Sequence, residues 1–379
     1  MMSLTTSTAR RALLVVAAGA ATLALTACGS SKPSPAPLES FKPTARVAVA
    51  WQGRIGDMSA DLGITVAGNT VTAVSTGGTL ASWDIATGKE QWRTQIDGRI
   101  SAGPGSDGRH AAVVTQNNEL MVFDQGKPAW REQLAGRVTT PPLVAGERVF
   151  VMMLDRNVRG YDALDGRWLW QYQRPGGDSL TLATRGVLAP FRDTLLVGQG
   201  SRLVGLDPTR GTVRFDVNVG TPRGTNEVER LADLVGPLAR ADDEACARVF
   251  QLSVACLELN RGSVRWARPQ SGTQGVAADE RFVIGADGAD RLTAWKMDKG
   301  EQLWRVDRFT HRGLSAPVIW GERAAVVDGS GYVHVLSLTD GSTLARFELD
   351  GAAAGAPIVS RDLLLVATRK GSVYALRLN

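Results

Sequence analysis

Histidine and cysteine are scarce in this chain of 379 residues, with only three of each. His110, His311 and His334 lie far apart, and no His, Cys or carboxylate pattern has the spacing of a metal site. The glycine-rich segments also lack the form of a phosphate-binding loop or of the turn that carries a catalytic serine. We therefore expect no metal, no cofactor and no catalytic residues, which argues against a metalloenzyme or a nucleotide-binding enzyme.

Runs of one charge are missing as well. The formal net charge is +5, and it falls to about +3 when Arg10 and Arg11 are removed with the N-terminal segment described below. Acidic residues are interspersed with the basic ones along the whole chain. The sequence therefore gives no support to nucleic-acid binding, which needs a concentrated basic surface.

Long hydrophobic runs are absent except near the N-terminus. Residues 12–25 are apolar and follow Arg10 and Arg11, but the run is too short to span a bilayer. A short apolar run behind positive charges is typical of the core of a signal peptide. We expect ordinary secretion, because the two arginines lack the rest of a twin-arginine export motif.

The four residues that end this segment, Leu-Thr-Ala-Cys at 25–28, resemble the lipobox of bacterial lipoproteins. In those proteins the cysteine becomes the lipidated first residue, so we predict a signal peptide over 1–27 and lipidation of Cys28. The alternative is an ordinary signal peptide that ends near a cysteine by chance. Residues 28–44 are rich in Ser and Pro, which predicts a flexible lipidated tether. By the same resemblance, Gly29 favours sorting to the outer membrane.

One phrase is repeated along the rest of the chain. An apolar residue, often followed by an acid, precedes a glycine, and an aromatic stands four residues after that glycine. The copies are Trp83, Gly88 and Trp92; Phe123, Gly126 and Trp130; Tyr161, Gly166 and Trp170; Leu206, Gly211 and Phe215; Leu257, Gly262 and Trp266; Trp295, Gly300 and Trp304; and Leu336, Gly341 and Ala345. The last copy lacks its aromatic.

The glycines of these copies are 38 to 51 residues apart, and no helical period is found over a long window. A period near forty with strand-like units is typical of a β-propeller. We predict an all-β fold in which each glycine makes a tight turn and each aromatic fills the wedge between adjacent blades. The repeats resemble those of quinoprotein dehydrogenases.

A proline marks the first strand of most blades, where a missing N–H breaks no ladder bond. These prolines are Pro104, Pro142, Pro190, Pro237, Pro317 and Pro357. After Pro357 the chain has room for only three strands, and residues 47–51 have the character of the missing fourth. We predict that the N-terminal strand completes the C-terminal blade, which closes a ring of eight blades over residues 45–379 and removes its free edge.

Two cysteines remain if Cys28 is lipidated, namely Cys246 and Cys256. An even pair in an exported chain can form a disulfide, provided that the hairpin between them has an odd-length turn or a bulge. The alternative is that Cys256 only fills the small-residue position that Gly160 and Gly205 hold in other blades.

Two consecutive connections between blades are unusually long. Trp170 and Pro190 are 20 residues apart and Phe215 and Pro237 are 22 apart, whereas most equivalent pairs are 12 or 13 apart. Insertions that gather on one face of a propeller commonly form a binding surface. Their mixed charges and leucines suit a protein partner better than a small substrate, although tolerated surface insertions are the alternative. The two insertions contain several charged residues and leucines, among them Leu180, Leu182, Arg185, Arg230, Leu231 and Asp233.

Together, the lipobox, the tether and the eight-bladed ring resemble the BamB family, the lipoproteins of the outer-membrane β-barrel assembly machinery. The more specific parts are the Leu182 to Gly186 region, residues 230–233 and residues 311–317. In that family, the loops that match the two long ones dock onto the periplasmic (POTRA) domains of BamA. The resemblance therefore implies that Leu182, Arg185, Arg230 and Asp233 contact the partner. Thr184 stands where the family pattern has Leu.

This resemblance implies a non-catalytic scaffold at the periplasmic face of the outer membrane. The lipid would be its only membrane contact, and the chain would be a monomer within a hetero-oligomeric complex. BamA and unfolded outer-membrane proteins would be its partners, and the complex would insert such proteins into the membrane.

Two other functions compete with this interpretation. A quinoprotein dehydrogenase shares the repeat and the number of blades, but it has adjacent cysteines beside its quinone, and no Cys-Cys pair occurs here. A propeller that binds envelope glycans would need aromatic side chains exposed in a groove. Six of the ten tryptophans fall on the repeated structural position: Trp51, Trp92, Trp130, Trp170, Trp266 and Trp304.

Overall fold

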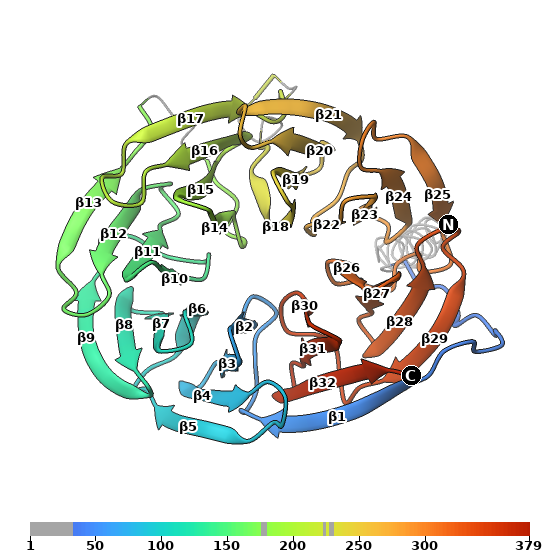
Figure 1. Cartoon of the computed structure of the whole chain (residues 1–379), viewed down its shortest axis with the longest axis horizontal. Helices are drawn as coiled ribbons and strands as arrows, with labels where there is room; N and C mark the ends of the chain where they lie inside the picture. The colour runs from blue at the N-terminus through green and yellow to red at the C-terminus, as the bar shows by residue number, and fades with distance from the viewer. Residues whose placement is uncertain (1–32, 176–179, 223–224, 227–230) are drawn as a thin grey trace, which may run out of the picture. The chain divides into compact units, whose positions relative to one another are not determined.

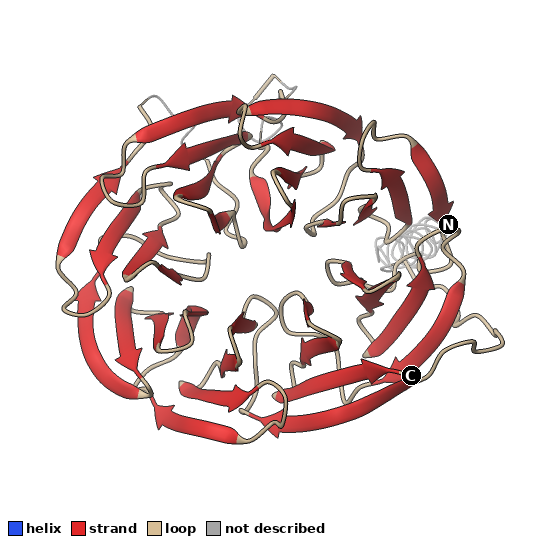
Figure 2. Cartoon of the chain, viewed as in Figure 1, coloured by secondary structure: helices blue, strands red, loops and turns tan. Residues whose placement is uncertain are grey.

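A computed structural model describes residues 33–175, 180–222, 225–226 and 231–379. Within it, Ala36–Asn379 form one compact unit, a ring of eight four-stranded sheets around a central channel (Figure 1). Every regular element in this part of the chain is a strand (Figure 2), and none is a helix long and apolar enough to cross a membrane. The prediction of an eight-bladed, all-β propeller is confirmed.

Each blade runs from an innermost strand beside the channel to an outer strand on the rim. Blades 1 and 2 are β2 (Ile64–Ala67), β3 (Thr70–Val74), β4 (Thr79–Asp84), β5 (Glu90–Gln95) and β6 (Ile100–Ser106), β7 (His110–Thr115), β8 (Glu119–Asp124), β9 (Lys127–Gln133). Blades 3 and 4 are β10 (Leu143–Ala145), β11 (Arg148–Met152), β12 (Val158–Asp162), β13 (Trp168–Tyr172) and β14 (Leu188–Phe191), β15 (Thr194–Gln199), β16 (Arg202–Leu206), β17 (Val213–Asn218).

The other half of the ring repeats this arrangement. Blades 5 and 6 are β18 (Leu234–Ala241), β19 (Glu244–Val249), β20 (Ser253–Glu258), β21 (Ser263–Pro269) and β22 (Ala277–Ala278), β23 (Phe282–Ala286), β24 (Leu292–Lys296), β25 (Gln302–Val306). Blades 7 and 8 are β26 (Val318–Trp320), β27 (Arg323–Val327), β28 (Tyr332–Ser337), β29 (Thr343–Glu348) and β30 (Ile358–Ser360), β31 (Leu363–Ala367), β32 (Ser372–Leu378), β1 (Val47–Arg54).

The two ends of the folded unit meet in blade 8. Strand β1 pairs antiparallel with β32, in a register that sets Val47 opposite Leu378 and Arg54 opposite Ser372. The outer strand of this blade is therefore supplied by the N-terminal end of the ring. The predicted closure of the ring is confirmed, and pairing from both ends removes the free sheet edge that an incomplete blade would leave.

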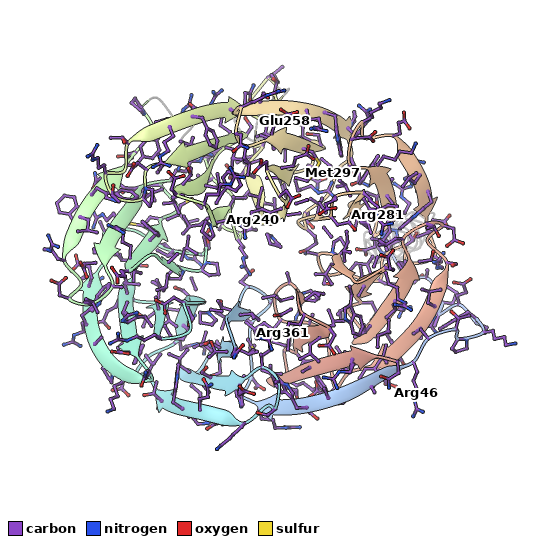
Figure 3. The ribbon with its side chains drawn as sticks, viewed as in Figure 1. Arg46, Arg240, Glu258, Arg281, Met297 and Arg361 are labelled. Carbon is purple, nitrogen blue, oxygen red and sulfur yellow. A yellow bond between two sulfur atoms is a disulfide. The ribbon has the colours of Figure 1, made fainter. Side chains whose placement is uncertain are left out.

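The core is built from the inner faces of neighbouring blades. The second and third strands of each blade are almost entirely buried, as in β7, where all six residues from His110 to Thr115 are buried. Figure 3 shows side chains filling the space between blades and leaving an opening only at the centre. Burial of alternating Val, Leu and Ala between sheets is the main source of stability for such a fold.

Where it is present, the repeated aromatic packs its blade against the next one. Trp170 on β13 donates its indole N–H to the Pro208 carbonyl of blade 4 at 3.0 Å, and a Cβ added to Gly211 would lie 2.5 Å from the same indole. Only a glycine lets the turn approach the ring this closely. The same bond joins Trp51 to Ile85, Trp130 to Ala163, Trp266 to Met297 and Trp304 to Leu338. The predicted inter-blade position of the aromatic is confirmed.

Ala345 lacks the aromatic for a topological reason. It lies on the outer strand of blade 7 and faces blade 8, whose third and fourth strands come from opposite ends of the chain. No glycine turn joins those two strands, so an aromatic at position 345 would lack the turn on which the other aromatics pack. Instead, the N–H groups of Thr44 and Ala45 donate to the neighbouring Leu344 carbonyl at 3.0 and 3.3 Å.

The prediction that each marker proline begins a strand is wrong for Pro104, Pro190 and Pro237, which lie inside β6, β14 and β18. These strands are innermost and pair on one side only, so a missing N–H can point into the channel without a lost bond. At Pro104 and Pro237 the register also shifts, which takes the proline out of the ladder.

The predicted tether is shorter than the sequence suggested. The Ala36 N–H donates to the Thr310 carbonyl at 2.9 Å, and the Ala36 carbonyl accepts from Arg312 at 2.6 Å. Further along, the Glu39 carbonyl accepts from Arg346 at 2.9 Å. Residues 36–45 therefore lie along blades 6 and 7 as a strap. Cys28 and the predicted signal peptide lie outside the described residues.

Cys246 and Cys256 face each other on β19 and β20, and their sulfur atoms are bonded. Three residues turn between Val249 and Ser253, which is the odd-length turn that the pairing requires. Cys256 also stands opposite Trp266, in the place of the small residues of other blades. Cys256 therefore both forms the disulfide and occupies the position of the small residue in other blades.

Removal of this disulfide is expected to lower the free energy of unfolding by about 2–3 kcal/mol, because the closed loop of ten residues restricts the unfolded chain. Chemical denaturation of wild type and of the Cys246→Ala/Cys256→Ala double variant measures the difference. The single variant Cys246→Ser under reducing conditions serves as the control for packing. Equal stability of wild type and double variant would contradict the expectation.

Candidate functional site

The connections between blades all emerge on one face of the ring, which we call the connector face. Most are short, such as residues 96–99 between β5 and β6. Two neighbouring ones, residues 173–187 and 219–233, are much longer. They lie side by side, because the Leu182 N–H of the first donates to Asp233 Oδ2 of the second at 2.6 Å. The predicted pairing of the two long loops on one face is confirmed.

Asp233 connects the two long loops to blade 3. Its Oδ1 accepts from Arg156 Nη2 at 2.8 Å, and each of the two side chains is only 15% exposed. Arg156 also donates to the Leu180 carbonyl at 2.9 Å. A carboxylate with both oxygens engaged inside the chain positions the loops and offers little to a partner.

Arg156 was not found by sequence reasoning. It lies in the turn between the second and third strands of blade 3, where its φ is 63°. No repeat position marks this turn, and its contact with Asp233 spans 77 residues of sequence. Nothing in the local pattern could have indicated it.

Arg185 lies at the mouth of the central channel. Its backbone carbonyl accepts from the Gly236 N–H at 3.1 Å, which fixes the loop to the next blade, while its side chain lines a cavity of about 250 Å³ with Asp61 and Arg369. Its Nη1 lies 3.8 Å from the place where a Cβ on Gly63 would stand, in the connection that enters blade 1. The side chain therefore extends into the channel rather than toward Asp233.

The Arg185 guanidinium has no hydrogen bond or ion pair among the residues that the structure describes, and burial lowers its pKa. No hydrogen bond or ion pair joins Arg185 to Asp233 among the described residues, and Asp233 is engaged by Arg156 and by the Leu182 N–H. A half-buried cation without a counter-ion is costly, and a carboxylate or another anion would relieve that cost. Arg185 is therefore a candidate for recognition of an anionic group at the connector face.

Leucines lie on the same two loops as Arg185. Leu180 is 38% exposed, and Leu182 is half-buried beside Thr181 and Leu154. Leu231, on the second loop, is also half-buried. Arg230, which we expected to contact the partner, lies outside the described residues.

Arg312, in the segment 311–317, forms a buried cluster with Asp328 and His334, which we call the clamp. Arg312 donates to Asp328 Oδ2 at 2.6 and 2.8 Å, and His334 Nε2 donates to the same oxygen at 2.9 Å. All three side chains are buried. Arg312 also holds the Ala36 carbonyl, so the clamp joins the strap to the core of blade 7.

The clamp has shifted pKa values with identifiable causes. Burial alone would raise the pKa of Asp328, but hydrogen bonds from His334, the Tyr332 N–H and Arg312 outweigh it and lower that pKa to about 2. Burial lowers the pKa of His334, although its bond to Asp328 opposes the shift. A buried neutral imidazole held by a carboxylate and beside Arg346 is a structural group, with no access for a substrate.

Acidification is therefore expected to destabilise the ring in two steps. The folded-state pKa of both groups is below the unfolded value, so their contribution is present at neutral pH and is lost as pH falls, first for His334 below its ordinary 6.5 and then for Asp328 from about 4 toward 2. The Asp328 step is worth about 2 kcal/mol. Denaturation at pH 7, 5, 3.5 and 2.5 checks both steps. His334→Gln should remove the first step and also reduce the second, because the hydrogen bond from His334 is one of the contacts that lower the Asp328 pKa.

Within the described ranges, no group of three or more His, Cys, Asp or Glu residues could hold a metal ion. The features that set this ring apart are two long loops, an unpaired guanidinium at the channel mouth and exposed or half-buried leucines. Such a ring is a β-propeller that presents a loop surface for binding.

Comparison with known proteins narrows this class. A family model described as "Outer membrane protein assembly factor BamB" matches residues 44–101, 78–306 and 296–378. Proteins of that name from Bordetella pertussis and Burkholderia pseudomallei are each 33% identical to the chain, over 94% and 96% of its length and 95% and 97% of their own. The chain belongs to the BamB family.

Solved structures agree on the fold. The crystal structure of BamB from Moraxella catarrhalis matches with a TM-score of 0.78 at 25% identity, over 88% of this chain and all of that one. A europium-containing methanol dehydrogenase matches with a TM-score of 0.66 at 13% identity, over 87% of this chain and 93% of that one. At that identity the dehydrogenase shares the fold alone, so the likeness carries no quinone chemistry to this chain.

Proposed function

We propose that this protein is a non-catalytic scaffold of outer-membrane protein assembly, which binds the periplasmic domains of BamA through its connector face. The observation that carries the proposal is the Arg185 guanidinium, unpaired at the channel mouth and flanked by the two long loops. Membership of a family whose members are named outer membrane protein assembly factors supports it.

The chemistry of the contact follows from the site. Arg185 would donate hydrogen bonds to a carboxylate of the partner in a partly desolvated setting, where a charge-assisted hydrogen bond is strong. Leu180 and Leu182 would add apolar contact beside it. Asp233 would act indirectly, since it fixes Leu182 and Arg156 in place.

Two further parts of the proposal concern location and clients. Lipidation of Cys28 would hold the ring at the periplasmic face of the outer membrane. Unfolded outer-membrane proteins would be brought to BamA, and the outer strands of the blades, each paired on one side only, offer edges to which an extended segment can add.

The direct test is binding of the chain from Gly29 onward, which retains the whole compact unit Ala36–Asn379, to the purified periplasmic domains of BamA. Saturable binding that is absent with an unrelated propeller of similar charge is the expected result. No binding would contradict the scaffold role and would direct attention to glycans or a bound quinone.

A further inference from the structure

A second cavity, of about 430 Å³, opens between blades 5 and 6. Blade 5 contributes the end of β21, and blade 6 contributes the turn between β23 and β24 together with β25. Three arginines line it, one from each of these elements: Arg268, Arg291 and Arg305. Ser271, Thr293 and Gln302 add neutral polar groups to the lining.

The positive charge of this cavity exceeds its negative charge. Arg291 Nε and Arg305 Nη2 both bond the same oxygen, Oδ2 of Asp287, at 2.7 and 3.2 Å. One carboxylate, 6% exposed, therefore serves two guanidinium groups. The remaining acid of the lining, Glu301, is already paired with Lys296 at 2.9 Å.

Arg268 adds a third cation, which forms no ion pair with an acid among the described residues and interacts with Glu301 only at longer range. Its bonds go to backbone carbonyls, those of Gly300 and Lys299 at 2.7 Å each. The terminal nitrogens of Arg291 make no hydrogen bond within the described residues, and Arg291 and Arg305 are 43% and 46% exposed. The cavity thus combines fixed guanidinium groups with free donors that solvent can reach.

This arrangement suits a phosphate group. Guanidinium forks bind phosphate oxygens in pairs, and two forks anchored by one carboxylate are held in position before a ligand arrives. The hydroxyls of Ser271 and Thr293 can supply further donors at the same opening.

The position of the cavity relative to the strap indicates where such phosphates come from. The turn that carries Asp287 and Arg291 is bonded to the strap's docking loop, since the His311 N–H donates to the Ala289 carbonyl and Ala36 docks on Thr310. Only seven residues, 29–35, separate Ala36 from Cys28, a reach of about 25–30 Å when extended. This step rests on the proposed lipidation of Cys28, which would hold the sector near lipid headgroups.

We propose that the cavity between blades 5 and 6 binds the phosphates of anionic lipid headgroups, as a second membrane contact beside the lipid on Cys28. The sequence had predicted the lipid as the only contact. Two points of attachment would fix the tilt of the ring relative to the membrane as well as its distance from the membrane. They would therefore set the direction in which the connector face points.

The test uses the non-lipidated chain from Gly29 and co-sedimentation with vesicles of phosphatidylcholine, with or without a third of phosphatidylglycerol. Wild type is expected to bind the anionic vesicles at least about fivefold better than the neutral ones. Gln302→Glu places a negative charge in the cavity, breaks no hydrogen bond, and is expected to abolish this difference. Gln171→Glu, with the same charge change on an exposed outer strand of blade 3, should retain it.

A second pair of variants guards against a folding defect. Arg305→Gln should weaken anionic-vesicle binding while Arg291 still pairs Asp287, whereas Arg377→Gln, an exposed ion-paired arginine of blade 8, should not. Equal losses in a variant and its control would overturn the proposal. The proposal would also be overturned if the cavity bound inorganic phosphate, seen as shifts of the arginine Nε–H resonances, while the chain did not bind the anionic vesicles. Unchanged binding of Gln302→Glu to the BamA domains separates this result from a failure of the scaffold role.

Discussion

Replacement of Arg185 by Glu is expected to weaken binding to the BamA periplasmic domains by about 1.5–3 kcal/mol, or roughly tenfold to more than a hundredfold. The guanidinium has no hydrogen bond or ion pair among the residues that the structure describes, so its removal disturbs none of their bonds and the loss falls on the complex. The substituted carboxylate would also repel an acidic group of the partner. Calorimetric titration of the chain from Gly29 gives the affinity.

The matched control is Arg361→Glu. Arg361 lies in the turn between β30 and β31, on the face opposite the connectors, and among the described residues its side chain bonds only that of Asn69, at 2.6 Å. The same charge reversal there should leave the affinity unchanged. Survival of binding in folded Arg185→Glu would move the contact elsewhere on the ring, and equal loss in both variants would indicate attraction by net charge alone.

Replacement of Trp170 by Ala is expected to destabilise the ring by about 3–5 kcal/mol, the range for buried aromatic residues cut back to alanine. Trp170 is 7% exposed, donates to Pro208 of the next blade and fills the space over Gly211. Its loss opens a cavity between blades 3 and 4 and leaves a carbonyl without its donor. Urea denaturation followed by tryptophan fluorescence measures the change.

Trp168, two residues earlier on the same strand, is the control. It is 60% exposed and its indole bonds only the Trp170 carbonyl at 2.9 Å. Trp168→Ala is expected to cost about 0.5 kcal/mol, as is typical of exposed positions. Similar losses for both tryptophans would show that the repeated aromatic does not hold the blades together.

The ring itself was predictable because its determinants are local and repeated. A glycine that must turn appears in each copy, and an aromatic follows it by four residues in all but the last, so the period of the sequence gives the period of the structure. The order of the blades then follows from the chain. Even the missing aromatic at Ala345 follows from the point where the ring closes.

The site was predictable only in part. Loop lengths identified the connector face and placed Leu182 and Arg185 on it, because an insertion in a repeat is visible without coordinates. The sequence could not show that Asp233 is occupied by Arg156, since that pair spans 77 residues and belongs to no repeat.

What the amino-acid sequence determined by itself is the fold, the number of blades and the closure of the ring, because a short-range pattern that occurs seven times leaves few alternatives. Only the tertiary structure decided which charges are free. Arg185 and Asp233 look alike as loop residues, yet burial and partners from distant blades leave one cation unpaired and neutralise the other group. Which charged groups form ion pairs depends on distances between residues of different blades, and the sequence pattern does not give those distances.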